Sequence, residues 1–201
     1  LIIDAARMYA STHKSYIAYA MGITQHLNGS DNVKSLSNLA LVTGNLGGVG
    51  NGVNPLRGQN NVQGACDMGA SPNQFYGYQN IDKPGILEKF EKAWGKTLNP
   101  NIGTKATDCF PKMISDEIKG LFIFGEDPVR TDPNTNLVIH ALESVDFFVV
   151  DELFMTETAK LADVILPGRS YTEKEGTFSN TERRVQRVRK AVEIAGETRP
   201  D

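Results

Sequence analysis

The sequence predicts an α/β fold with a three-layer αβα arrangement, and two observations support this fold class. Between residues 121 and 167, short apolar runs alternate with segments of helical pattern. Apolar runs of four to six residues separated by helices are typical of βαβ units, so the sheet should be mostly parallel and Rossmann-like. Residues 44–69, in contrast, are rich in Gly and Asn, which is typical of a functional loop in an α/β domain rather than of core.

The first 43 residues predict a strand between two helices. Residues 1–10 have the pattern of the end of a helix, and SYIAYA at 15–20 predicts a short buried strand. A second helix is predicted over 32–43, with Asp31 as its N-cap and Gly44 as its stop. Its apolar residues recur at helical spacing: Val33, Leu36, Leu39 and Val42.

The Gly/Asn-rich loop of residues 44–69 marks the predicted domain boundary. We expect residues 1–59 to be the C-terminal part of one α/β domain that ends in this loop. Residues 60–201 should form most of a second α/β domain that binds a cofactor. Leu1 opens directly into a helical pattern without an initial Met, so the chain reads as a fragment of a multidomain protein.

The second predicted domain carries the alternating pattern. A helix over 106–118 is weakened by Pro111. The other predicted elements are helices at 83–95, 134–144 and 155–162, strands at 121–125, 146–151 and 163–167, and a terminal hairpin at 176–194.

Composition excludes several classes of protein. Lys+Arg is 21 and Asp+Glu is 24, so the net charge of −3 argues against nucleic-acid binding by bulk charge. No apolar run is long enough to span a membrane and no secretory signal is visible, so we expect a cytoplasmic protein. Cys66 and Cys109 form no CxxC motif, and we assign no metal ligand within this chain.

The segments that follow the three predicted strands carry the first candidate site. They read GEDPVRTD, DELFMTET and GRSYTEKEGTFSNTE, and each mixes Asp or Glu with Thr. Ligands of parallel sheets bind at the carboxyl ends of the strands, so this edge indicates a nucleotide-like ligand. In the alternative interpretation, Asp127 and Pro128 only form a turn and Thr131 caps the next helix.

The Gly/Asn-rich loop carries the second candidate site. Glycines allow the backbone to approach a ligand, and Arg57 is the only cation of the loop. A lone arginine among neutral amides fits a bound anion, which its planar guanidinium can hold with two hydrogen bonds. The alternative is a surface arginine on an ordinary loop.

Several motifs resemble the catalytic subunit of molybdopterin-dependent formate dehydrogenases. GVNPLRGQNNVQGACDMGA at 52–70 is similar to that family nearly letter for letter. MGITQH (21–26), TGNLGGVGNG (43–52) and GEDPVRTD (125–132) also match. The motifs within 149–167 and 173–186 are shared more widely in the superfamily, and the resemblance covers residues 1–192.

The resemblance implies oxidation of formate to carbon dioxide at molybdenum or tungsten held by two molybdopterin guanine dinucleotides. In this family the arginine that matches Arg57 holds the formate anion. The residues that match Gln59, Gln25 and Met21 contact the cofactor, and those that match Asp127 and Thr131 bind a guanine dinucleotide. Asp151, at a position that is often glutamine in relatives, also falls at the cofactor.

The resemblance also implies what lies outside this chain. A 4Fe-4S cluster and the cysteine or selenocysteine ligand of the metal would lie in a missing N-terminal region. Partners would be formate, the remaining domains of the subunit and electron-transfer subunits. We expect the isolated fragment to be inactive and to self-associate through an unpaired sheet edge.

Three alternative functions stay open at this stage. The chain could come from another oxidoreductase of the superfamily, such as the large subunit of NADH dehydrogenase or a nitrate reductase. It could also be a non-catalytic nucleotide-binding module. A nicotinamide-dependent dehydrogenase is disfavoured, because no GxGxxG motif follows a predicted strand.

Overall fold

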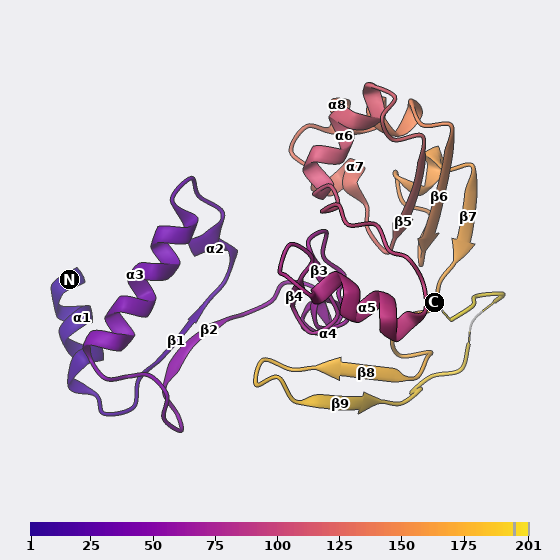
Figure 1. The fold of residues 1–201 in the computed structure, drawn as a ribbon. Helices are drawn as coiled ribbons and strands as arrows, with labels where there is room; N and C mark the ends of the chain where they lie inside the picture. Colours follow the sequence, from indigo (N-terminus) through magenta and orange to yellow (C-terminus); the bar gives the residue numbers. More distant parts are fainter. Residues whose placement is uncertain (195, 201) are drawn as a thin grey trace. The chain divides into compact units, whose positions relative to one another are not determined.

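The computed structural model describes residues 1–194 and 196–200, and the chain divides into two compact units (Figure 1). The first unit contains Leu1–Ala65 and Ser179–Val185, and the second contains Cys66–Phe178 and Gln186–Asp201. In the described part of the chain, no helix has the length and apolar character needed to cross a bilayer. The boundary predicted at residue 59 concerns the domains of the longer protein and stays a prediction.

The first unit is built on two parallel strands and two longer helices. The helices are α1 (Ile2–Ser11) and α3 (Gly29–Val42), with a single turn, α2 (Met21–Thr24), between them. Strand β1 (Tyr16–Tyr19) pairs in parallel with β2 (Gly52–Pro55). Parallel pairing confirms the predicted α/β class, but β1 is exposed and half-buried in alternation rather than buried as predicted.

Helix α3 begins earlier than the sequence predicted. Asn28 is its N-cap, so Asp31 lies in the first turn and the N-cap predicted for it is wrong. Gly29 opens the helix because its backbone lies against Thr24, whose carbonyl would overlap a Cβ atom at this position. The end of the helix agrees with the prediction, since Thr43 is its C-cap.

Asn45 ties the end of α3 to the chain that enters β1. Only 1% of Asn45 is exposed, and its Oδ1 accepts a hydrogen bond from the Ser15 N–H at 3.0 Å. Its amide donates to Thr43 Oγ1 at 3.1 Å. A buried amide must satisfy its hydrogen bonds within the protein, so Asn45 fixes the path of this turn.

The Gly/Asn-rich segment is more ordered than a loop. It contributes β2, and it also contains the short helix α4 (Val62–Asp67). The purely irregular structure expected for residues 44–69 is therefore wrong at these two places. Glycine and asparagine weaken the periodic signal by which strands and helices are recognised in sequence.

The second unit begins with a small hairpin and a helix. Strands β3 (Gln74–Phe75) and β4 (Gln79–Asn80) pair antiparallel, and α5 (Ile86–Trp94) follows. The rings of Phe75 and Phe90 stack with centroids 4.5 Å apart, and Trp94 packs edge-on against both. Aromatic packing therefore joins the hairpin to α5.

A three-stranded parallel sheet of order β5-β6-β7 follows, as predicted. Its strands are β5 (Gly120–Phe124), β6 (Phe147–Glu152) and β7 (Val164–Pro167). The helices of this region are α6 (Ala106–Ile114), α7 (Pro128–Thr131) and α8 (Thr135–Glu143), with the 3-10 turn η1 (Ala159–Leu161) before β7. Helix α6 contains Pro111 and ends four residues short of the predicted end, and the helix predicted over 155–162 is reduced to η1.

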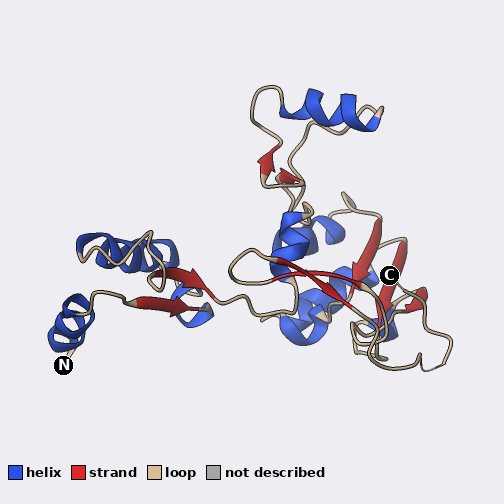
Figure 2. Ribbon diagram, turned by 90° about the horizontal axis from the view of Figure 1, so that it is seen from below, coloured by secondary structure: helices blue, strands red, loops and turns tan. Residues whose placement is uncertain are grey.

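The core of the second unit lies on one face of this sheet, where α6 and α8 cover it (Figures 1 and 2). Buried side chains from the helices and from β6 form the cluster Phe110, Met113, Val129, Val138, Ala141, Leu142, Phe148, Val150 and Ala159. On the other face, Phe122 and Phe124 are each 56% exposed. Alternation along β5 therefore gives one covered and one open face within the described residues.

The terminal hairpin consists of β8 (Gly176–Ser179) and β9 (Val185–Val188), as the sequence predicted. One exposed ion pair joins β9 to the residue before β8, since Arg187 Nη2 lies 2.7 Å from Glu175 Oε2. An exposed pair of this kind contributes little to stability.

Candidate functional site

The candidate site predicted in the Gly/Asn-rich loop lies at the carboxyl edge of the β1–β2 pair. Tyr19 and Pro55 are partners in the register and end the two strands together. The Leu56 N–H donates to the Tyr19 carbonyl at 2.7 Å, which extends the pairing by one residue. The segments 20–25 and 56–59 therefore leave the same edge, and these segments carry four of the predicted site residues.

Met21 and Gln25 are brought into contact. Met21 begins α2 and Gln25 is its C-cap, so the two side chains lie one turn apart. Gln25 Nε2 donates to Met21 Sδ at 3.3 Å. Both residues are exposed, which leaves the amide oxygen of Gln25 accessible to a ligand.

Arg57 is exposed on the segment after β2, two residues before Gln59, which is also exposed. Among the described residues, Arg57 makes no hydrogen bond and no ion pair. An arginine whose five N–H groups have no protein acceptor can bind a small anion with two parallel hydrogen bonds.

The loop that carries Arg57 is anchored by Asn61, a residue that the sequence analysis did not single out. Asn61 Oδ1 accepts a hydrogen bond from the Ser179 N–H at 3.0 Å, within the first unit. The same side chain packs on Gly64, where a Cβ atom would overlap it. The motif GQNNVQG could have indicated this contact, because it places a glycine, Gly64, three residues after Asn61.

The candidate site predicted after the three strands lies at the carboxyl edge of the β5–β6–β7 sheet. The Gly125 N–H donates to the Asp151 carbonyl at 2.9 Å, and the Gly168 N–H donates to the Glu152 carbonyl at 3.1 Å. The segments after β5 and β7 therefore leave the sheet on either side of the end of β6. Ligands of parallel α/β sheets bind at such an edge.

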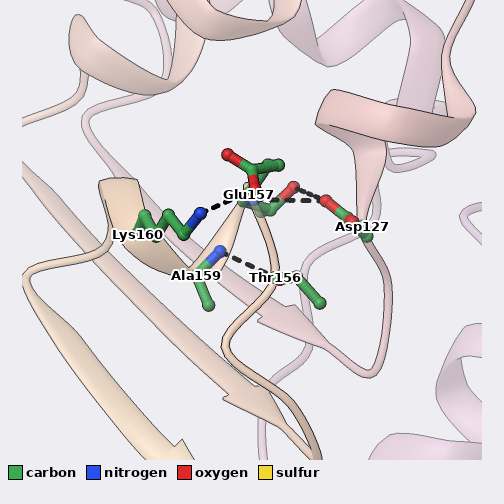
Figure 3. A network of polar contacts seen from close by, with 6 residues as sticks. Asp127, Thr156, Glu157, Ala159 and Lys160 are labelled. Carbon is green, nitrogen blue, oxygen red and sulfur yellow. Dashed lines mark hydrogen bonds and ion pairs between the residues drawn. The ribbon is translucent and has the colours of Figure 1, made fainter.

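Asp127 follows β5 and is held in place by Thr158. Asp127 Oδ1 accepts hydrogen bonds from the Thr158 hydroxyl at 2.6 Å and from the Thr158 N–H at 3.1 Å (Figure 3). Thr158 is fully buried. The segment DELFMTET ends at Thr158, but no motif or periodicity in the sequence indicates a role for this residue.

Thr131 ends α7 and does not cap the next helix. Its hydroxyl lies 3.0 Å from Glu126 Oε1, within the same GEDPVRTD segment. The N-cap of α8 is Asn134, whose Oδ1 accepts from the Leu137 N–H at 3.2 Å. The alternative that gave Thr131 a capping role is therefore wrong.

Asp151 lies inside β6, where the register pairs it with Phe124 and Leu166. Its carboxylate packs against Gly168, the first residue after β7, and a Cβ atom at Gly168 would overlap it. Asp151 is half-buried, so its position is set by the neighbouring strand end.

Neither cysteine belongs to a group of metal-ligating residues. The described residues contain no cluster of three or more His, Cys, Asp and Glu side chains that could hold a metal ion. Burial raises the pKa of the Cys109 thiol; nearby Lys112 lowers that pKa and Asp108 raises it. Cys109 is therefore predominantly protonated at neutral pH.

The family model and the similar proteins point to the same family. A family model described as molybdopterin oxidoreductase matches residues 6–201. The alpha subunit of F420-dependent formate dehydrogenase 1 from Methanococcus maripaludis is 52% identical over 201 residues, covering 100% of this chain and 29% of that protein. Formate dehydrogenase H from Escherichia coli is 45% identical over 201 residues, covering 100% of this chain and 28% of its own length.

A solved structure supports the same fold at low sequence identity. Acetylene hydratase from Pelobacter acetylenicus matches with a TM-score of 0.69 and 20% identity, over 100% of this chain and 30% of that one. The chain thus spans less than a third of the length of each of these relatives.

Proposed function

The chain belongs to the molybdopterin oxidoreductase family, and we propose that the longer protein containing it oxidises formate to carbon dioxide. The relatives named as formate dehydrogenases, at 45–52% identity over the whole chain, support this substrate. The observation that carries the proposal is Arg57, an exposed cation without a protein partner among the described residues. Formate is a small planar carboxylate, the shape that a guanidinium binds with two hydrogen bonds.

The residues at each strand edge, taken separately, offer groups that suit a molybdopterin guanine dinucleotide. Gln25 and Gln59 offer neutral amides for the edges of a heterocycle, and Met21 offers a polarisable thioether. Asp127 and Thr131 offer acceptors to the N–H groups of guanine, and Asp151 lies at the same edge as Asp127. These donors and acceptors suit an organic cofactor rather than direct ligation of a metal.

When bound, the cofactor supplies a redox-active metal, molybdenum or tungsten, for the two-electron oxidation of formate. The residues of this chain bind and orient formate and the cofactor. The Arg57 fork holds the formate carboxylate in one plane and prevents its rotation, which lowers the entropic cost of reaching the reactive geometry. The amides of Gln25 and Gln59 keep the cofactor fixed while formate gives up a proton and two electrons.

Further components of the proposed enzyme lie outside this chain. We assign a 4Fe-4S cluster and the ligand of the metal to other parts of the same subunit. Electrons then pass to separate electron-transfer subunits, as the designation of the relatives as alpha subunits suggests. Residues 1–201 alone should have no formate dehydrogenase activity.

The variant Arg57→Lys in the full-length enzyme tests the role of Arg57. Lysine keeps the positive charge but loses the planar fork, so the KM for formate should rise by about tenfold or more. The measurement is formate-dependent reduction of an artificial dye over a range of formate concentrations. The matched control is Arg7→Lys, which changes another exposed arginine of the first unit and should leave the rate unchanged.

Two results would contradict the proposal. Unchanged kinetics in Arg57→Lys would remove Arg57 from the formate site. Dye reduction by the unmodified enzyme that does not depend on formate would assign it to another chemistry of the family.

A further inference from the structure

Thr158 is a fully buried polar residue whose hydroxyl and backbone N–H form hydrogen bonds with the segment that follows β5. It precedes η1, 31 residues beyond Asp127 in the chain. Its hydroxyl donates to Asp127 Oδ1 at 2.6 Å and accepts from the Val129 N–H at 3.1 Å. The segment 156–160 lies directly beside Asp127 (Figure 3).

The two carboxylate oxygens of Asp127 differ in their hydrogen bonding. Oδ1 accepts from both the hydroxyl and the N–H of Thr158, which uses its two lone pairs. Oδ2 has no hydrogen-bond partner among the described residues. Rotation of the side chain would break both bonds to Oδ1, so Thr158 fixes the direction of Oδ2.

We propose that Thr158 is the positioning residue for Asp127, and that it presets Oδ2 to accept hydrogen bonds from the N1–H and 2-amino groups of guanine. This inference rests on the guanine dinucleotide assigned under the proposed function. A carboxylate that is already oriented loses no rotational freedom on binding, so the ligand is held more tightly.

The chemistry at this position requires a hydroxyl. One atom must donate to a carboxylate and accept from a backbone N–H, and valine, which has the shape of threonine, can do neither. Serine keeps both roles. Thr158→Val would therefore release Asp127 and leave the Val129 N–H without its acceptor, whereas Thr158→Ser would keep the arrangement.

The test measures guanosine monophosphate released by acid hydrolysis from the purified full-length enzyme, per mole of protein. Thr158→Val should lower this content by about tenfold after gel filtration, and Thr158→Ser should stay near the unmodified value. Asp127→Asn replaces the free acceptor Oδ2 by an N–H donor, so it should also lower the content of guanosine monophosphate. The double variant should be no worse than Asp127→Asn, because Thr158 acts through Asp127.

The control separates positioning from stability. Val138→Ala removes buried volume from the core cluster but keeps every hydrogen-bonding group of Thr158 and Asp127, so it should lower the melting temperature and keep the guanosine content. Equal loss of guanosine in Val138→Ala and Thr158→Val would overturn the inference. So would an unchanged content in Thr158→Val, or a loss in Thr158→Ser as large as in Thr158→Val.

The readout does not use formate, so it is independent of the substrate assignment. An unmodified enzyme that releases no guanosine monophosphate overturns the dinucleotide assignment and this inference together. An enzyme that releases it but does not oxidise formate overturns the substrate assignment alone.

Discussion

Gly168 shows how a single residue affects the position of a candidate cofactor-binding side chain, that of Asp151. Its backbone follows β7 and donates to the Glu152 carbonyl at 3.1 Å. A Cβ atom here would overlap Asp151 Oδ1, so the present position of the Asp151 carboxylate depends on the absence of a side chain at Gly168. Interiors are close-packed and cannot absorb an added methyl group without displacement of a neighbour.

Gly168→Ala should therefore displace the Asp151 carboxylate and, because this group ends a flexible side chain, destabilise the second unit by only about 1 kcal/mol. The fluorescence of Trp94, the only tryptophan of the chain, reports unfolding of this unit in urea. Gly176→Ala is the control, because no atom lies within 4 Å of a Cβ atom at that position. Identical unfolding midpoints for the two variants would show that the strand end has room for a side chain.

Helix α3 shows how a local contact decides where an element begins. Its apolar spacing was visible in the sequence, and its end at residue 42 agrees with the prediction. Its start depends on the single turn α2, because the Thr24 carbonyl occupies the space of a side chain at Gly29. The helix therefore starts at a glycine, and Asp31 takes a place in the first turn.

Gly29→Ala should loosen the contact between α2 and α3 and destabilise the first unit by about 1–3 kcal/mol. Hydrogen exchange of the α3 amides, followed by mass spectrometry, should show faster exchange than in the unmodified protein. Gly22→Ala, in α2 itself, has no atom within 4 Å of the new Cβ and should leave the exchange unchanged. Protected α3 amides in Gly29→Ala would contradict this account of the helix start.

At the scale of the whole molecule, the parallel sheet of the second unit is open in two ways within the described residues. Its order β5-β6-β7 leaves β5 and β7 as edge strands. Its uncovered face exposes Phe122, Phe124 and Phe147, each by more than half. Unpaired edges and exposed aromatic side chains both favour association with other chains.

Residues 1–201 prepared as a separate protein should therefore self-associate, and light scattering should show a mass that rises with concentration. The double variant Phe122→Lys/Phe124→Lys places charges on the open face and should shift the chain towards the monomer. A strictly monomeric fragment over a wide concentration range would refute the expectation.

Much of this organisation was predictable from the sequence. Apolar runs between helical patterns predicted β5, β6 and β7 in parallel, and the motifs around Arg57 and Asp127 resembled one family, to which the chain belongs. These predictions succeed because residue periodicity and short motifs are local properties, written in consecutive residues. The sequence also placed Asp127 and Thr131 after a predicted strand, but it did not predict β2, the strand that precedes Arg57 and Gln59.

Tertiary structure alone decided the contacts between distant residues. Thr158 reaches Asp127 across 31 residues, Asn61 reaches Ser179 across 118, and Gly168 makes room for Asp151. No periodicity reports such contacts, since they depend on which backbone groups the fold brings within hydrogen-bond distance. The sequence by itself determined the fold class and the family, while packing and buried hydrogen bonds determined which side chains hold the candidate site in place.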